Sequence, residues 1–307
     1  MVWQVFTARK SFSDPVIGSR WANRCGLHLA RIRLSDVFLA ARRWWLFRGK
    51  LTEEMQQFRR DGFVALEGFL EPQDYKVLKA NAEAVMQAAD ATGPAPSYRD
   101  AGFGQPHIYN WGFDRCDGST VNRFYTLPSD DVLSRLADNP RFRRLLEYAS
   151  GCRFEPRRLL LYRLIQGSDG GRPDNQRDIH RDTFHSCVKF WFALSDVSEE
   201  CGPLHYLKGS QRFNEQRWRW EKARSIWASE NNKGGAFRCS AAEANAQYGD
   251  VPQPLVVKEN TLVLADVRGW HHRGYARPGM ERLAVYGSFR PSPFGLPKVR
   301  PLDSNGQ

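Results

Sequence analysis

Three residues in the second half of the chain have the types and spacing of a metal-binding triad. His180 and Asp182 stand two positions apart, and a second histidine, His271, follows 91 positions after His180. On an extended segment the first pair would project to the same side, because side chains alternate along a strand. A histidine from a distant strand would complete three ligands on one face of an octahedral ion. Two histidines and one carboxylate arranged in this way are typical of non-haem Fe(II) oxygenases.

Each ligand position has a competitor in the sequence. His271 is followed directly by His272, and only one of two adjacent strand residues can point inward. Asp178 lies two positions before His180 and offers a second carboxylate. The spacing of residue types alone therefore does not decide which carboxylate and which distant histidine would be ligands.

The elements that would position these residues are short strands separated by glycine and proline. Such a pattern favours a mainly β domain with flanking helices, of the sandwich or jelly-roll type. A long polar segment at 211–250 interrupts the strands, and an insertion of this length is usually functional or disordered. Strands are predicted at Phe63–Glu67, Leu159–Gln166, Cys187–Val197, Pro203–Leu207, Leu255–Val257, Thr261–Asp266 and Leu283–Arg290.

The first 50 residues carry most of the positive charge of the chain. The whole sequence has a net charge of +11, and residues 1–50 hold ten Lys or Arg against two acids. A localised basic segment indicates an anionic partner, such as a membrane surface, a nucleic acid or an acidic substrate. We therefore divide the chain into a basic N-terminal segment, 1–50, and a domain at 51–307 that contains the insertion at about 211–250.

An amphipathic helix is predicted at residues 26–47 within the basic segment. Apolar residues recur there at three- and four-residue spacing, with Trp44 and Trp45 beside several arginines. Aromatic and cationic residues together suit a helix lying in a membrane interface. The alternative is a helix packed against the domain with solvated arginines. The apolar positions are Leu27, Ala30, Leu34, Val37, Phe38, Ala41 and Trp45.

Other features of the chain exclude several classes. The six cysteines form no CxxC pair, which argues against a disulfide framework or a structural zinc site and favours a reducing cytoplasm. The sequence contains no apolar run of about 18 residues, so no transmembrane helix is expected. The N-terminus also lacks the pattern of a secretory signal.

The ordered motifs resemble those of the phytanoyl-CoA dioxygenase family of Fe(II)/2-oxoglutarate oxygenases. The resemblance covers roughly residues 52–295. It includes His180-Arg181-Asp182, the segment LSDVSEECGPLHYLKGSQ at 194–211, and a histidine followed eleven positions later by Arg282. That spacing selects His271 over His272, and Asp178 does not match the family motif.

The resemblance implies a set of cofactors and roles. His180, Asp182 and His271 would bind Fe(II), with 2-oxoglutarate and O2 at the remaining positions. Arg282 would bind the distal carboxylate of 2-oxoglutarate, since a guanidinium matches a carboxylate with two hydrogen bonds. Tyr286 and Ser288 share the face of Arg282 by alternation and are candidates to assist the same carboxylate.

The substrate is not fixed by family membership. Candidate substrate contacts are His107, Tyr109, His185, Arg217 and Arg219, which offer aromatic and cationic groups to an acidic or sugar-like molecule. Within the family, this profile resembles bacterial Kdo 3-hydroxylases, which act on lipopolysaccharide precursors at the cytoplasmic face of the inner membrane. The alternatives are a hydroxylase of a soluble small molecule or an acyl-CoA, and a non-catalytic or nucleic-acid-directed protein of the same fold. The complete set of iron and 2-oxoglutarate residues argues against a non-catalytic protein.

Overall fold

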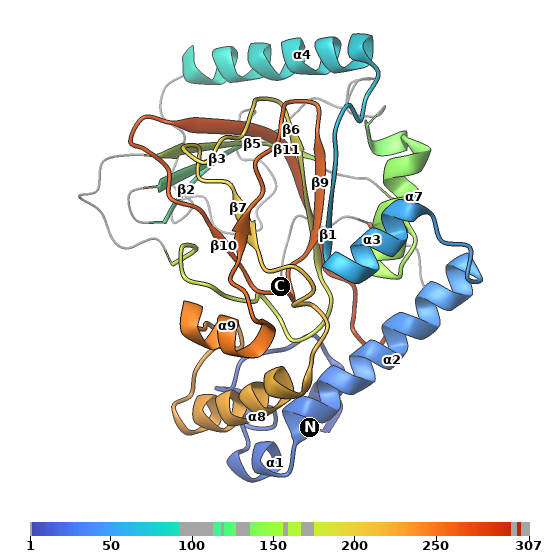
Figure 1. Cartoon of the computed structure of the whole chain (residues 1–307), viewed down its shortest axis with the longest axis vertical. Helices are drawn as coiled ribbons and strands as arrows, with labels where there is room; N and C mark the ends of the chain where they lie inside the picture. Colours follow the sequence, from blue (N-terminus) through green and yellow to red (C-terminus); the bar gives the residue numbers. More distant parts are fainter. Residues whose placement is uncertain are drawn as a thin grey trace.

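A seven-stranded antiparallel sheet forms the centre of the computed structural model, which describes residues 2–91, 113–117, 120–126, 136–155, 159–166, 175–295 and 300–301 (Figure 1). The strand order is β1-β9-β6-β11-β5-β3-β2. In that order the strands are β1 (Phe63–Leu66), β9 (Leu262–Asp266), β6 (Val188–Ala193), β11 (Glu281–Phe289), β5 (Leu160–Gln166), β3 (Thr120–Thr126) and β2 (Phe113–Asp117).

A smaller antiparallel sheet lies in front of the large one in Figure 1. It contains β10 (His271–Arg273), β7 (Leu204–Tyr206) and β8 (Gln253–Pro254), in that order. A short parallel pair, β4 (Phe154–Glu155) and β12 (Arg300–Pro301), stands apart from both sheets. The two antiparallel sheets form a double-stranded β-helix, so the predicted jelly roll with flanking helices is confirmed.

Most predicted strands are present, but β2 and the seven-residue β3 of the large sheet were not predicted. The strand predicted at Leu255–Val257 is wrong, because β8 ends at Pro254 and Val257 forms only an isolated bridge with Val197. Strand β10, which carries His271, was not predicted. It has only three residues, too few for an alternating pattern to be recognised.

Helices cover the outer face of the large sheet and the lower end of the molecule in Figure 1. The outer face packs against α3, α4 and α7 in the largest hydrophobic core, where the Phe142 ring of α7 lies 4.9 Å from the Phe190 ring of β6. The opposite, inner face of β6 and β11 carries the site. The helices are η1 (Val2–Phe6), α1 (Arg20–Arg24), α2 (Leu27–Phe47), α3 (Glu53–Asp61), α4 (Pro72–Ala91), α7 (Pro140–Ser150), α8 (Glu215–Glu230) and α9 (Ala241–Tyr248).

Helix α2 packs on the domain through a face that contains arginines. Arg31 and Arg42 are buried. Arg31 donates hydrogen bonds to the carbonyl oxygens of Val5, Thr7 and Arg9, and Arg42 donates to carbonyl oxygens within residues 292–295. All of these acceptors are backbone carbonyls. The two guanidinium groups therefore hold the backbone segments 5–9 and 292–295 against the helix.

The apolar residues of α2 are divided between the two sides, because Ile32, Leu39 and Phe47 are buried and others are exposed. Val37, Trp44 and Trp45 are 63%, 60% and 59% exposed, and Ala41 is also exposed. The helix predicted at residues 26–47 is thus present, but part of its predicted apolar stripe is on the surface. None of the described helices is long and apolar enough to cross a bilayer.

The insertion at 211–250 is folded into α8 and α9. Asn214 caps α8 by accepting from the Arg217 amide, and Ser240 with Glu243 forms a capping box on α9. Helix α8 packs against α1 and α2, so the insertion and the N-terminal segment form one helical layer beneath the sheets (Figure 1).

Candidate metal centre

His180, Asp182 and His271 lie together in the structure and are all buried. One ligand atom from each lies within 4.8 Å of the others. The Asp182 Oδ1 atom is 3.5 Å from His180 Nε2 and 3.9 Å from His271 Nε2. A single ion can bridge these atoms after a small side-chain movement, so this cluster has the donor set and spacing of a metal site.

Backbone carbonyls orient both imidazole rings toward the carboxylate. His180 Nδ1 donates to the Asp178 carbonyl at 2.7 Å, and His271 Nδ1 donates to the Gly269 carbonyl at 2.9 Å. A carbonyl only accepts, so each proton is held at Nδ1 and the Nε2 lone pair is left for a metal. Burial lowers the pKa of His271 to about 3, which keeps that ring neutral. His180 Nε2 has no hydrogen-bond partner in the described structure, as expected of a ligand atom.

Arg181 points away from this cluster into a buried ionic network. Its guanidinium donates to both carboxylate oxygens of Glu221 on α8, each at 2.7 Å, and to the Gly235 carbonyl. Arg217 donates to the same carboxylate at 3.0 Å, and the His28 ring of α2 lies 3.0 Å from it. Side-chain alternation therefore places His180 and Asp182 on one side of the segment. Arg181 points to the other side, where its ionic network joins the segment to α2 and α8.

The charges in this network explain how Glu221 stays ionised. Burial alone would raise the pKa of the Glu221 carboxyl, but Arg181 and Arg217 outweigh burial and hold the pKa well below its usual value. The carboxylate is completely buried, as are both guanidinium groups.

Three cations surround Asp182. Lys189 Nζ lies 2.7 Å from Asp182 Oδ2, Arg290 lies 3.6 Å from the same oxygen, and Lys10 donates to the Asp182 carbonyl. Burial would raise the pKa of Asp182, but Lys189 and the two histidines lower it well below its usual value. The site is therefore rich in positive charge even before a metal binds.

The two competing residues of the sequence lie outside the cluster. His272 pairs in register with His205, with ring centroids 4.5 Å apart, and its Nδ1 bonds the Arg273 carbonyl. The Asp178 carboxylate is 3.2 Å from Arg238. The described structure thus brings His271 and Asp182 to the site, in agreement with the spacing argument.

Arg282 lies on the inner face of β11 beside a cavity of about 30 Å³. Its Nε atom is buried without a hydrogen-bond partner. Burial also lowers the pKa of the guanidinium. Trp191 lines the same cavity.

Tyr286 and Ser288 share the inner face with Arg282 but lie further along β11. Ser288 is six residues from Arg282, about 20 Å along an extended strand. It pairs in register with Lys189, and its Oγ atom is buried without a partner. Ser288 therefore stands at the metal end of the strand. The Tyr286 ring lies between these positions, 5.8 Å from that of Trp191.

The candidate substrate contacts fall in different surroundings. His107 and Tyr109 lie outside the described residues. His185 is buried, hydrogen-bonded to the Ser186 carbonyl, and burial lowers its pKa to about 3. Arg217 is buried between Glu221 and Trp270, whereas Arg219 is exposed and paired with Glu215 on the outside of α8. The structure favours a structural role for Arg217.

Sequence reasoning missed the cations around Asp182. One signal was present: Lys189 is the only charged residue in the strand sequence VKFWFA, whose other members are all apolar. A lysine there must either be solvated or meet a buried anion. No local pattern marks Lys10, because its contact with Asp182 joins residues 172 positions apart.

A sequence profile described as Phytanoyl-CoA dioxygenase (PhyH) matches residues 58–272, more than two thirds of the chain. The chain belongs to this family. It is accordingly an Fe(II)/2-oxoglutarate-dependent dioxygenase, and the His-Asp-His cluster provides the metal site that this chemistry needs. A search of curated proteins found no match.

Solved structures with a related fold are distant from this chain. EvdMO1 is 17% identical with a TM-score of 0.47, and the match covers 78% of this chain but 49% of EvdMO1, about half of its length. EctD from S. alaskensis is 16% identical with a TM-score of 0.49, covering 82% of each chain. The epimerase SnoN, solved with Fe3+, alpha ketoglutarate and nogalamycin RO, is 20% identical with a TM-score of 0.43, covering 78% of this chain and 85% of SnoN. Similarity at this level does not identify a substrate.

Proposed function

We propose that this dioxygenase hydroxylates an acidic, sugar-bearing substrate at an anionic membrane surface, and that the substrate is the Kdo sugar of lipopolysaccharide precursors. The observation that carries the proposal is the surplus of cations around the metal-binding carboxylate. Kdo is itself a sugar acid, so its carboxylate would be attracted to such a site.

In this proposal His180, Asp182 and His271 hold the iron, which together with 2-oxoglutarate supplies the oxidising chemistry when bound. The protein's contribution is geometric: the carbonyls of Asp178 and Gly269 fix both rings with Nε2 toward the metal. Arg282 is assigned to the distal carboxylate of 2-oxoglutarate, because its buried Nε lacks a partner.

The cations near Asp182 are assigned to the anionic substrates. Lys189 faces the interior next to the metal site, and Asp182 raises its pKa although burial lowers it. The Arg290 side chain is 40% exposed and lies 3.6 Å from the Asp182 carboxylate. A carboxylate entering this region would meet a fixed positive charge at close range, where electrostatic attraction is strong.

Membrane association is assigned to the N-terminal segment. Helix α2 packs on the domain through Arg31, Arg42 and buried apolar residues, and it leaves Trp44 and Trp45 exposed at its C-terminal end. Aromatic side chains at headgroup level with cations on anionic lipid would stabilise such a helix at an interface. The proposed location is the inner face of a bacterial inner membrane.

The test is mass spectrometry of lipopolysaccharide from cells with and without this protein. The proposal predicts one additional oxygen on the inner sugars when the protein is present, and loss of that oxygen in the Asp182→Asn variant. An unchanged glycolipid would refute the substrate. Consumption of 2-oxoglutarate by the purified protein with Fe(II) and O2 tests the reaction class separately.

A further inference from the structure

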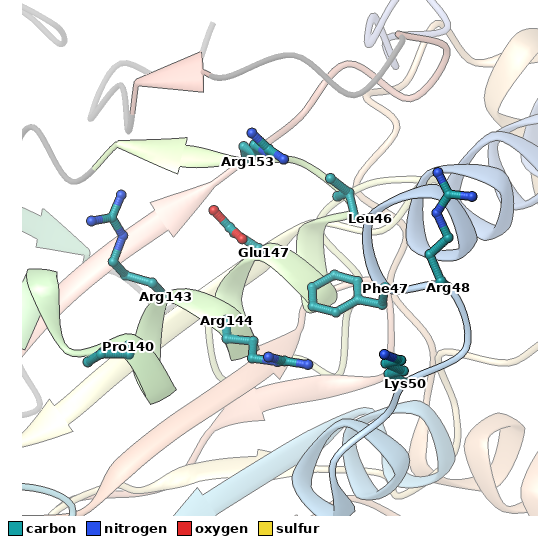
Figure 2. A pocket seen from close by; sticks show the side chains of 9 residues that line it. All are labelled: Leu46, Phe47, Arg48, Lys50, Pro140, Arg143, Arg144, Glu147 and Arg153. Atoms are coloured by element: carbon teal, nitrogen blue, oxygen red, sulfur yellow. The ribbon is translucent and has the colours of Figure 1, made fainter.

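A second strongly basic pocket lies away from the metal site. It has a volume of about 590 Å³ and opens between the C-terminal end of α2 and helix α7. Figure 2 shows side chains from α2 and the following turn on one side and from α7 on the other, with Arg153 closing a third side. The lining residues are Leu46, Phe47, Arg48, Lys50, Pro140, Arg143, Arg144, Glu147 and Arg153.

The lining holds five cations and one carboxylate. Arg143 is 3.4 Å from Asp138, but no carboxylate pairs with Arg48, Lys50, Arg144 or Arg153 among the residues that the structure describes. Surface cations are usually solvated along a flat face, whereas these surround a hollow. Five cations face one lining carboxylate in the part of the pocket that the structure describes, so an anion in the hollow would lower the electrostatic energy.

The backbone holds part of this arrangement in place. The Arg48 amide bonds the Trp44 carbonyl at 2.7 Å and the Lys50 amide bonds the Phe47 carbonyl at 2.8 Å, which fixes the turn after α2. The Arg144 guanidinium lies 5.9 Å from the centre of the buried Phe47 ring. The pocket therefore combines a fixed turn and a buried apolar ring with cations around its rim.

The pocket cannot be part of the metal site. Helix α7 packs on the outer face of the large sheet through Phe142 and Phe190, while Lys189, the neighbour of Phe190, faces the metal site on the inner face. A ligand in the pocket is thus separated from the iron by the sheet.

The surface beside the pocket indicates where its ligand comes from. The Arg48 guanidinium lies 5.8 Å from the Trp44 ring and 5.4 Å from the Trp45 ring, and both rings are exposed. Tryptophan rings next to a cationic hollow match the boundary between the acyl chains and phosphates of a bilayer.

We propose that this pocket binds the phosphate of an anionic phospholipid headgroup, while the exposed face of α2 enters the interface. The inference rests on the proposed membrane location and adds a specific site to it. It makes no assumption about the substrate. Inorganic phosphate compounds share the same chemistry, so the experiment distinguishes the two sources.

The test compares the full-length protein with the double variant Arg144→Gln/Arg153→Gln. Both arginines are exposed, so we expect the variant to retain the fold. The matched control is Lys222→Gln/Lys233→Gln, which removes the same charge from exposed positions on α8 and just beyond its end. Binding to phosphatidylglycerol vesicles is measured by co-sedimentation, and binding of inorganic pyrophosphate by calorimetry without vesicles.

We expect the pocket variant to bind vesicles about 30-fold more weakly, from about 1 kcal/mol for each cation near an anionic surface. The control should change less than threefold. If pyrophosphate binding depends on Arg144 and Arg153 but the protein does not bind vesicles, the pocket is an anion site for a soluble ligand and not for a lipid headgroup. Equal loss in pocket and control variants, or no loss in either, would overturn the inference. Retained vesicle binding in the pocket variant, with loss in Trp44→Ser/Trp45→Ser, would overturn the pocket and leave the membrane location intact.

Discussion

Replacement of Glu221 by glutamine would remove the carboxylate that pairs with Arg181 and Arg217 in the buried network. The amide keeps the shape of the side chain, but Arg181 and Arg217 remain completely buried without a counter-charge. Removing one partner of a buried ion pair costs about 3–5 kcal/mol. Domains are stabilised by about 5–15 kcal/mol in total, so this single change would remove a large share of the free energy of unfolding.

The assay is urea denaturation of the purified protein, followed by circular dichroism, with Glu215→Gln as the control on the same helix. Glu215 pairs with Arg219 on the surface, with side chains 77% and 74% exposed, so its replacement should have no measurable effect. A loss below about 1 kcal/mol in Glu221→Gln would refute the reasoning. It would mean that water or a rearranged side chain already compensates the two arginines.

Three further predictions concern the same region. His271→Ala should abolish Fe(II) binding, measured by metal content after gel filtration, whereas His272→Ala should retain it; the reverse result would exchange their roles. Lys189→Met removes the cation that lowers the pKa of Asp182, so this carboxylate should take up a proton at a higher pH. As the solution is acidified, Fe(II) should therefore be released at a higher pH than from the unchanged protein, and an unchanged midpoint of Fe(II) release would contradict this. Because the folded-state pKa of Glu221 is depressed, its stabilisation is present above its ordinary pKa of 4.5 and lost as the pH falls through the folded value. The free energy of unfolding should therefore fall less steeply with decreasing pH in Glu221→Gln than in the unchanged protein.

Strand β5 and the pair His180 and Asp182 could be predicted because their signals are local. Strand β5 is marked by a compact apolar run, and the pair by a two-residue spacing that needs only side-chain alternation. The choice of His271 over His272 depended on the eleven-residue spacing to Arg282 in the family motif. The helices of the insertion could also have been predicted, since Asn214 and the Ser240–Glu243 box are recognisable N-terminal caps.

The orientation of α2 could not be predicted. Hydrophobic periodicity predicts that Val37 and Trp45 face the core, yet the buried positions include Arg31 and Arg42. Their guanidinium groups are satisfied by carbonyl oxygens from residues 5–9 and 292–295. Sequence cannot show such acceptors, because they come from irregular chain segments far from the helix.

The position of Arg181 between two metal-facing residues has a consequence for how the iron is taken up. The segment carrying His180 and Asp182 is bonded through Arg181 to Glu221, and through Glu221 to His28. Its conformational entropy is thus lost when the chain folds, before any metal arrives. The apoprotein is preorganised, and a chelator should strip the iron from an enzyme that stays folded and reloads without a slow structural phase.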